Sequence, residues 1–387
     1  MAEIFRSALN YISQTGKSEN DFVGQYVELG PVQLRVRRVI AEGGYGFVFV
    51  AQDTSTGKEY ALKRLMAGDE AANKSILNEI TILKRLRGHP NIVQFYSAAS
   101  LSEKETDHGM SEYLILTELC SGGELIKLMQ ERYGQPYPPH QVLKMCYQTC
   151  RAVAHMHKQT PPVIHRDLKV ENLLISARGQ IKLCDFGSST TIQQFPDESW
   201  TALQRSLVED ELQRNTTPMY RAPEMIDLYS NMPITEKGDI WALGCILFFL
   251  CFMEHPFEDS AKLRILNAKY TIPENDTKYT VFHDLIRYML QVNPVNRPDI
   301  REVLTGLEAI AIAMDVDLKG RVRDDIPPTS GERSPPGSTS GPPPAPSSSG
   351  NSVLLGGVVK GANSLLVISR ICPTKLCSLL QDMSRMT

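Results

Sequence analysis

The sequence predicts an α+β fold in which a small β-rich N-terminal lobe precedes a larger helical C-terminal lobe and a disordered tail. Apolar residues recur mostly with period two from Val27 to about Lys84, which is typical of strands, and with helical spacing after Gly122. Beyond about Asp317 the chain becomes rich in proline, serine and glycine, which cannot bury a core. The expected boundaries are an N-terminal extension at 1–26, a two-lobed domain at 27–316 divided near 119–120, a linker at 317–352 and a tail at 353–387.

The individual elements follow from the same periodicity. Short apolar runs separated by turns predict strands at 34–36, 47–50, 60–63 and 113–118, and a helical pattern occupies 70–87. The Gly122-Gly123 pair then breaks the chain. After this break, apolar spacing predicts helices at 139–158, 237–252, 280–291 and 300–314. Strands before the break and helices after it predict two lobes with a cleft between them.

The ends of the chain carry weaker signals. Residues 1–12 place an apolar stripe on one side of a short helix, made of Ile4, Phe5, Ala8, Leu9 and Ile12. We expect this helix to dock on the domain surface, with membrane or partner contact as the alternative. Residues 353–368 are apolar but interrupted by glycines and a lysine. Because no uninterrupted apolar run of about 18 residues occurs, no membrane-spanning helix is expected.

The overall composition excludes several classes of function. The formal net charge of −3 and the pI near 6.3 provide no global field that attracts nucleic acid or an anionic membrane. The eight cysteines show neither C-x-x-C pairs nor zinc-type spacing, which is typical of a reducing cytosol. We therefore expect a cytoplasmic protein without a disulfide framework or a nucleic-acid partner.

Two short motifs carry the strongest chemical signal. His165-Arg166-Asp167 is followed by Asn172, five residues after the aspartate, and then by Asp185-Phe186-Gly187. This ordered set is the pattern of phosphoryl transfer to a hydroxyl: Asp167 accepts the proton, while Asn172 and Asp185 hold Mg²⁺ against the ATP phosphates. Lys169 can neutralise charge on the transferring group.

A glycine-containing segment lies between two predicted strands. It fits the phosphate-binding pattern G-x-G-x-x-G-x-V, with alanine in place of the first glycine. The glycines of this pattern let backbone amides approach phosphate oxygens closely. Val48 would cover the adenine. By itself the segment is more typical of an ordinary hairpin turn. The expected nucleotide contacts in it are Ala41, Glu42, Gly43, Gly44, Tyr45, Gly46 and Val48.

Lys63 completes the predicted phosphate site. It follows Ala61 and Leu62 on a predicted strand and can bind the α- and β-phosphates if an acidic residue orients it. Glu79, on the following helix, is the expected partner, and Glu70 is a less well placed rival. Leu174 is expected to form the floor of the adenine site opposite Val48. The catalytic set is thus Asp167, Lys169, Lys63 and Glu79.

With these motifs in order, residues 30–316 resemble a eukaryotic protein kinase domain, and Lys169 is typical of the Ser/Thr class. More narrowly they are similar to the Numb-associated kinase family, through the Ala41-Glu42-Gly43-Gly44 loop, Cys184 before Asp185, and the long segment between Asp185 and Glu224. Further similar blocks are 227–231, 240–247 and 255–259.

The resemblance implies roles for further residues. Thr117 falls at the gatekeeper position, Glu118, Leu119 and Cys120 form the hinge that binds adenine, and Ala61 and Cys184 line the ATP site. His165 would pack beneath Phe186, and Arg166 would pair with a phosphorylated residue or another acid. Thr217 would lie near Asp167, Glu224 would pair with Arg297, and Asp239 would anchor the catalytic loop.

An extra helix after the activation segment is expected at 225–232. Cys184 is either a handle for thiol-reactive ligands or, the favoured reading, a core cysteine.

The implied function is ATP- and Mg²⁺-dependent phosphorylation of mu subunits of clathrin adaptors, with peripheral association at clathrin-coated membranes and perinuclear or trans-Golgi locations. The alternatives are a catalytically inactive scaffold and a truncated form that binds adaptors without releasing them. Intact Lys63, Glu79, Asp167, Asn172 and Asp185 argue against an inactive scaffold. The phosphatase-like, clathrin-binding and J domains of the larger family members do not follow residue 316, so we expect either a short splice form or a gene-model artefact.

Overall fold

A computed structural model describes residues 22–322 except 44–45, 105, 107, 133 and 258–261. The apolar stripe expected at 1–12 and the segments at 323–352 and 353–387 lie outside the described residues. Within the described part, no helix is both long enough and apolar enough to cross a membrane.

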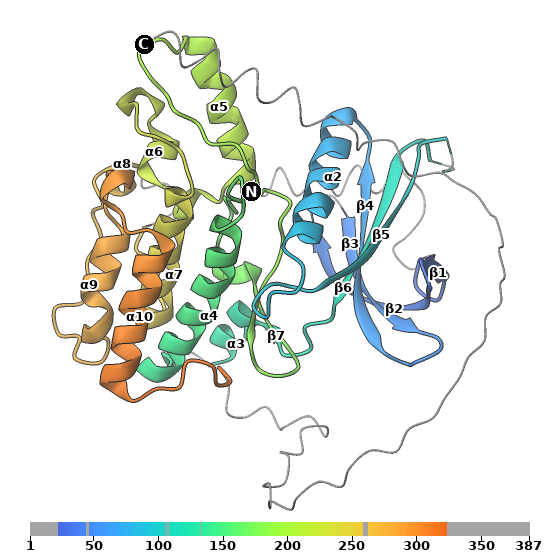
Figure 1. Cartoon of the computed structure of the whole chain (residues 1–387), viewed down its shortest axis with the longest axis horizontal. Helices are drawn as coiled ribbons and strands as arrows, with labels where there is room; N and C mark the ends of the chain where they lie inside the picture. The colour runs from blue at the N-terminus through green and yellow to red at the C-terminus, as the bar shows by residue number, and fades with distance from the viewer. Residues whose placement is uncertain are drawn as a thin grey trace, which may run out of the picture. The chain divides into compact units, whose positions relative to one another are not determined.

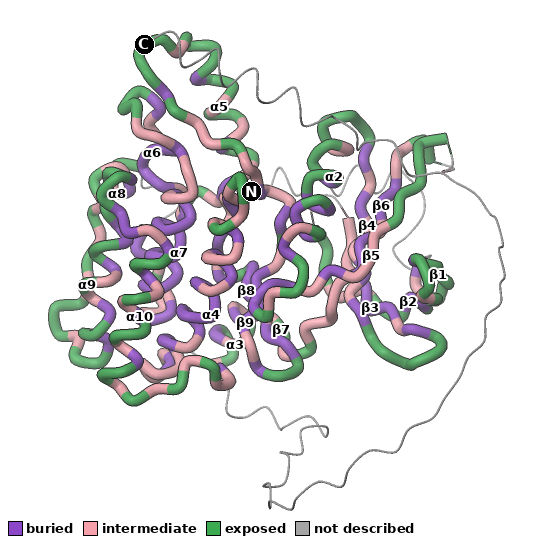
Figure 2. Tube along the Cα trace, in the orientation of Figure 1, coloured by how far each residue is buried: buried purple, intermediate pink, exposed green. Residues whose placement is uncertain are grey.

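The N-terminal lobe is built on an antiparallel sheet with strand order β1-β2-β3-β4-β6-β5 (Figure 1). One helix, α2 (Glu70–Arg85), packs against β4, β5 and β6, and Asp69 caps it by accepting a hydrogen bond from the Ala72 amide at 2.7 Å. Buried and exposed residues alternate along α2 in Figure 2, as expected of a helix with one face on a sheet. The strands are β1 (Tyr26–Leu29), β2 (Val32–Gly43), β3 (Gly46–Asp53), β4 (Glu59–Ala67), β5 (Phe95–Leu101) and β6 (Ser111–Glu118).

The C-terminal lobe is mainly helical. Its central helix α7 is buried along almost its whole length because it is apolar on all sides. A small sheet with order β7-β8-β9 lies on the side that faces the N-terminal lobe. The elements are β7 (Gly123–Glu124), α3 (Leu125–Glu131), α4 (Pro139–His157), β8 (Leu173–Ile175), β9 (Ile181–Leu183), α5 (Ala202–Asn215), α6 (Pro223–Ile226), α7 (Lys237–Phe252), α8 (Lys262–Leu266), α9 (Thr280–Met289) and α10 (Ile300–Met314).

The folded part extends beyond both expected boundaries. Phe22 is only 7 % exposed and packs with Phe49, at a ring distance of 5.1 Å, so the N-terminal lobe includes residues before 27. Val322 is fully buried, and its amide donates to the Gly179 carbonyl at 2.9 Å. Residues 317–322 therefore pack on the domain over the turn between β8 and β9, so the folded part reaches at least residue 322.

The extra helix expected at 225–232 is also wrong in its position. That stretch contains only the end of α6 and a 3-10 turn at Leu228–Ser230, separated by the extended residue Asp227, and it is ended by Asn231 in the left-handed conformation at φ 54°. The long additional helix is α5, which lies inside the segment between Asp185 and Glu224.

Candidate active site

Lys63 lies at the centre of an ionic cluster that joins both lobes. It projects from β4, and its Nζ is 2.8 Å from Oε1 of Glu79 on α2 and 3.4 Å from Oδ1 of Asp185 after β9. Burial alone would lower the pKa of Lys63, but the two carboxylates raise it above its usual value. The predicted partner Glu79 is confirmed, whereas its rival Glu70 is exposed and pairs with Lys74 on the helix surface.

The two carboxylates of this cluster differ in their environment. The Glu79 side chain is 6 % exposed, and burial raises its pKa although Lys63 opposes this. The Asp185 side chain is 50 % exposed; burial raises its pKa, but Lys63 outweighs this effect and the pKa lies below its usual value. Asp185 is therefore the carboxylate of the two that is more accessible to a cation.

The catalytic loop brings three predicted side chains together. The Thr217 hydroxyl donates to Asp167 Oδ1 at 2.6 Å, and Lys169 Nζ lies 2.7 Å from Asp167 Oδ2. Lys169 also donates to the Thr217 hydroxyl at 3.0 Å. Both oxygens of Asp167 are thus held, which fixes the carboxylate in one orientation. Such a carboxylate can accept a proton from a hydroxyl placed beside it.

Asp239 of α7 anchors this loop from below, as predicted. It is 1 % exposed and accepts the backbone amides of His165 at 2.9 Å and Arg166 at 3.0 Å. Arg166 has φ 68°, a backbone conformation that residues other than glycine rarely adopt. The two hydrogen bonds to Asp239 hold it in place. Burial raises the pKa of Asp239, but His157, 2.9 Å away, reverses this and lowers it. The His165 ring also packs against Phe186, 5.3 Å away, as expected.

Asn172 and Asp185 fit a magnesium site that relies on substrate phosphates. The side-chain Nδ2 of Asn172 donates to the backbone carbonyl of Asp167 at 2.8 Å, which leaves the side-chain Oδ1 for a metal. The Cys184 amide donates to the Asn172 carbonyl at 3.1 Å and so links the two predicted ligands. Among the described residues, no group of three or more His, Cys, Asp or Glu could hold a metal. One carboxylate, one amide oxygen and phosphate oxygens suit Mg²⁺, which retains several waters.

The segment predicted to bind phosphate is the hairpin between β2 and β3. Ala41 pairs with Val48, and exposed Ala41 and Glu42 lie near its tip. A Cβ at Gly46 would lie 1.9 Å from the Arg64 carbonyl oxygen, so only glycine fits there. Gly43 ends β2, while Gly44 and Tyr45 lie outside the described residues.

The predicted hinge follows β6. Thr117 pairs with Ala61 across β4 and β6, so these two expected adenine-site residues are neighbours. Leu119 and Cys120 are half-buried, and the Cys120 carbonyl accepts a hydrogen bond from Gly123 at 3.2 Å. Burial raises the pKa of Cys120 to about 12. The hinge residue Glu118 makes contacts of its own, which are described below.

Two further residues expected to line the nucleotide site, Leu174 and Cys184, lie in β8 and directly after β9. Leu174 is half-buried in β8, as a floor residue requires. The Cys184 thiol donates to the Asn172 carbonyl at 3.3 Å, and burial raises its pKa. The raised pKa disfavours the thiolate that a thiol-reactive ligand needs, and the half-buried thiol is held by its hydrogen bond.

Two contact partners could not be assigned from the sequence: the acid expected beside Arg166 and the partner of Glu118. Arg166 pairs with Glu211 of α5 at 2.6 Å, and Glu118 pairs with Lys182 of β9 at 2.6 Å. The helix α5, which carries Glu211, could have been predicted from its capping signature, because Thr201 and Gln204 form the T-x-x-Q box that starts it. The second pair joins residues far apart in sequence and leaves no local signal.

The ion pair predicted between Glu224 and Arg297 is confirmed. Both side chains are fully buried, with two N–O distances of 2.7 and 2.5 Å. Arg297 also donates to the backbone carbonyls of Lys237, Gln291 and Val292, so its remaining donors are paired inside the C-terminal lobe. This pair lies within the helical lobe, and its role is structural.

Comparison with known proteins agrees with this geometry. The protein kinase domain family matches residues 34–306. Two probable serine/threonine-protein kinases of Dictyostelium discoideum are 44% and 39% identical over 74% of this chain, covering 25% and 35% of their own lengths. The serine/threonine-protein kinase AKL1 of Saccharomyces cerevisiae is 35% identical over 76% of this chain and 28% of its own length.

The chain thus spans about a quarter to a third of the length of these curated relatives. The matched region contains most of both lobes and every residue of the ionic cluster and the catalytic loop described above. The chain therefore belongs to the protein kinase family.

Proposed function

We propose that this kinase transfers the γ-phosphoryl group of ATP in line to a threonine or serine hydroxyl. The observation that carries the proposal is the triad of Asp167, Lys169 and Thr217, in which both carboxylate oxygens of Asp167 are held by hydrogen bonds. Asp167 orients the incoming hydroxyl and accepts its proton, and Lys169 stabilises charge on the transferring group.

The other residues hold the nucleotide. Lys63, oriented by Glu79, binds the α- and β-phosphates. Asn172 and Asp185 would hold Mg²⁺, which neutralises charge on the phosphate oxygens. The backbone of 118–120, with Ala61, Val48 and Leu174, would enclose the adenine. A catalytically inactive scaffold is the weaker alternative, because the buried pairing of Lys63 with Glu79 is the arrangement that a working phosphate site requires.

For the substrate we propose mu subunits of clathrin adaptor complexes, phosphorylated mainly on threonine. The proposal rests on the resemblance of the sequence to the Numb-associated kinases, and to cyclin-G-associated kinase in the blocks at 240–247 and 255–259. Action on these subunits would place the kinase in the cytoplasm, at trans-Golgi and clathrin-coated membranes, in membrane trafficking.

The test is transfer of labelled γ-phosphate from Mg-ATP to a purified mu subunit and to a generic substrate, with Asp167→Asn as the matched inactive variant. We expect threonine labelling of the mu subunit that disappears in Asp167→Asn. Labelling of the generic substrate alone would overturn the adaptor assignment. ATP binding without labelling of either substrate would overturn the catalytic proposal in favour of the scaffold.

A further inference from the structure

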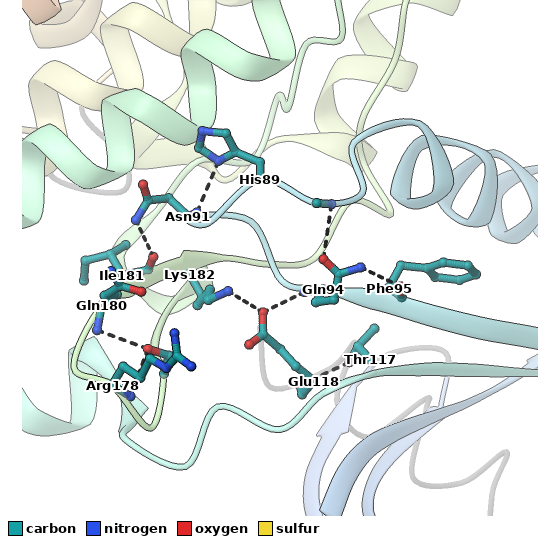
Figure 3. A network of polar contacts seen from close by, with 12 residues as sticks. His89, Asn91, Gln94, Phe95, Thr117, Glu118, Arg178, Gln180, Ile181 and Lys182 are labelled. Atoms are coloured by element: carbon teal, nitrogen blue, oxygen red, sulfur yellow. Dashed lines mark hydrogen bonds and ion pairs between the residues drawn. The ribbon is translucent and has the colours of Figure 1, made fainter. Parts of the chain in front are cut away.

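A polar network behind the hinge connects the two lobes (Figure 3). At its centre, Oε1 of Glu118, the last residue of β6, lies 2.6 Å from Nζ of Lys182, the middle residue of β9. Lys182 is 9 % exposed and lies between Ile181 and Leu183, which are fully buried. An unpaired ammonium in such a position is strongly unfavourable, so Lys182 depends on the Glu118 carboxylate.

The same carboxylate fixes the linker between α2 and β5. The Gln94 amide donates to Glu118 Oε1 at 2.7 Å, and the Glu118 amide donates back to the Gln94 carbonyl at 2.9 Å. This linker is itself bonded to β9: the Leu183 amide donates to the Asn91 carbonyl at 2.8 Å, and the Val93 amide donates to the Leu183 carbonyl at 2.9 Å. Hinge, linker and β9 therefore form a closed ring of hydrogen bonds.

The ring borders the proposed nucleotide site in two places, at the hinge and at β9, the strand that leads to Asp185. Lys182 is directly opposite Leu174 in the pairing of β8 with β9, so the two side chains lie on the same face of this small sheet. Three residues after Lys182, the chain reaches Asp185. The strand that holds the hinge from behind thus leads directly into the proposed metal ligand.

We propose that Lys182 is a positioning residue for ATP. By holding the Glu118 carboxylate, it keeps the hinge backbone at a fixed distance from Asp185, so that one bound nucleotide meets adenine contacts and phosphate contacts together. Lys182 acts through Glu118 and does not itself touch the nucleotide. The inference rests on the proposed nucleotide site, and small displacements of such a site reduce binding and rate strongly.

The experiment measures the dissociation constant of a fluorescent ATP analogue with Mg²⁺ and without a phosphoacceptor. Lys182→Met keeps the length of the side chain and removes its charge, and we expect about tenfold weaker binding, since hydrogen bonds to charged groups are at stake. Lys182→Arg retains the ion pair and should remain within about twofold of wild type. Hydrogen exchange should rise in the peptide containing 118–121 in Lys182→Met alone.

Arg85→Met is the matched control, because it removes another contact between the lobes. Arg85 donates to Oε1 of Gln159 at 3.1 Å and to the Pro161 carbonyl at 2.5 Å, remote from the hinge. We expect its nucleotide affinity to equal that of wild type. Equal losses in Arg85→Met and Lys182→Met would overturn the inference, because any loosening of the lobes would then suffice.

A folding defect in Lys182→Met is separated by the double variant Lys182→Met/Glu118→Gln, which buries no unpaired charge. We expect it to recover thermal stability and still to bind the analogue about tenfold more weakly. Unchanged or tighter binding in this double variant would overturn the inference. Binding that is lost in Lys63→Ala but unchanged in Lys182→Met would overturn this inference alone, whereas a wild type that binds no nucleotide would overturn the proposed site as well.

Discussion

At the scale of single residues, the two carboxylates that contact Lys63 differ in their exposure to solvent. Glu79 and Asp185 both contact Lys63, but only Asp185 has a side chain half exposed to solvent. Glu79 therefore orients the lysine, while Asp185 is available to a metal. Substitutions at the two positions should have different consequences, because one removes an internal ion pair and the other a ligand.

Asp185→Asn should abolish phosphotransfer while leaving the fold intact. The change removes the charge of one proposed magnesium ligand with little change in shape, and we expect kcat to fall by at least about a hundredfold. Steady-state labelling and thermal unfolding measure the two effects. Asp210→Asn, an exposed position on α5, is the control. Retained turnover in Asp185→Asn would contradict the assignment of this ligand.

Thr217→Val tests the hydroxyl that holds Asp167. Valine preserves the branched shape but loses the 2.6 Å hydrogen bond to the carboxylate, so kcat should fall about ten- to hundredfold with little change in KM for ATP. Kinetics at varied ATP separate the two constants. The exposed Thr271→Val serves as control. A rise in KM for ATP at unchanged kcat would show that Thr217 acts on the nucleotide site.

At the scale of elements, α5 is the feature that shapes the activation segment. Its Glu211 lies 2.6 Å from Arg166, which also donates to the Ser188 carbonyl at 2.6 Å. The acid that Arg166 was expected to meet is thus a residue of the folded segment itself. A helix held at the catalytic loop in this way ties the order of the segment to the geometry of Asp167.

Glu211→Gln should loosen this helix. The Glu211 side chain is 41 % exposed, so the ion pair is partly screened, and we expect only a few-fold loss in kcat together with faster hydrogen exchange over 190–217. Glu209→Gln, an exposed position on the same helix, is the matched control. If both variants behave alike, general helix charge rather than the contact with Arg166 is responsible.

Elements with strong periodicity were predictable from the sequence. The bounds of α7 (Lys237–Phe252) and α10 (Ile300–Met314) are confirmed, because both are long apolar patterns, and α10 begins with a capping box at Asp299. Helix α5 was missed because most of its residues face solvent. The catalytic motifs were readable since each is local, whereas the pair of Glu118 with Lys182 depends on tertiary packing.

At the scale of the whole molecule, stability depends on buried polar contacts in each lobe. Arg297→Met should destabilise the domain by about 3–5 kcal/mol, because it leaves the Glu224 carboxylate buried without its partner. Chemical denaturation measures the loss. The double variant Arg297→Met/Glu224→Met should recover much of it, and a double variant as unstable as the single one would show that shape rather than charge is decisive.

Acid should destabilise the domain through carboxylates that the fold keeps ionised, and Asp53 at the end of β3 isolates one of them. The Thr56 hydroxyl, and then the hydroxyl and amide of Ser55, donate to its side chain and lower its pKa from 3.8 to about 2. A carboxylate with a depressed folded pKa contributes stability that is fully present above its unfolded pKa and is lost as the pH falls through the folded value.

Wild type should therefore exceed Asp53→Asn in stability at pH 6, and the difference should shrink between pH 3.8 and about 2. Urea unfolding at several pH values measures this difference. A difference that stays constant down to pH 2 would mean that Asp53 acts through packing, because packing does not titrate.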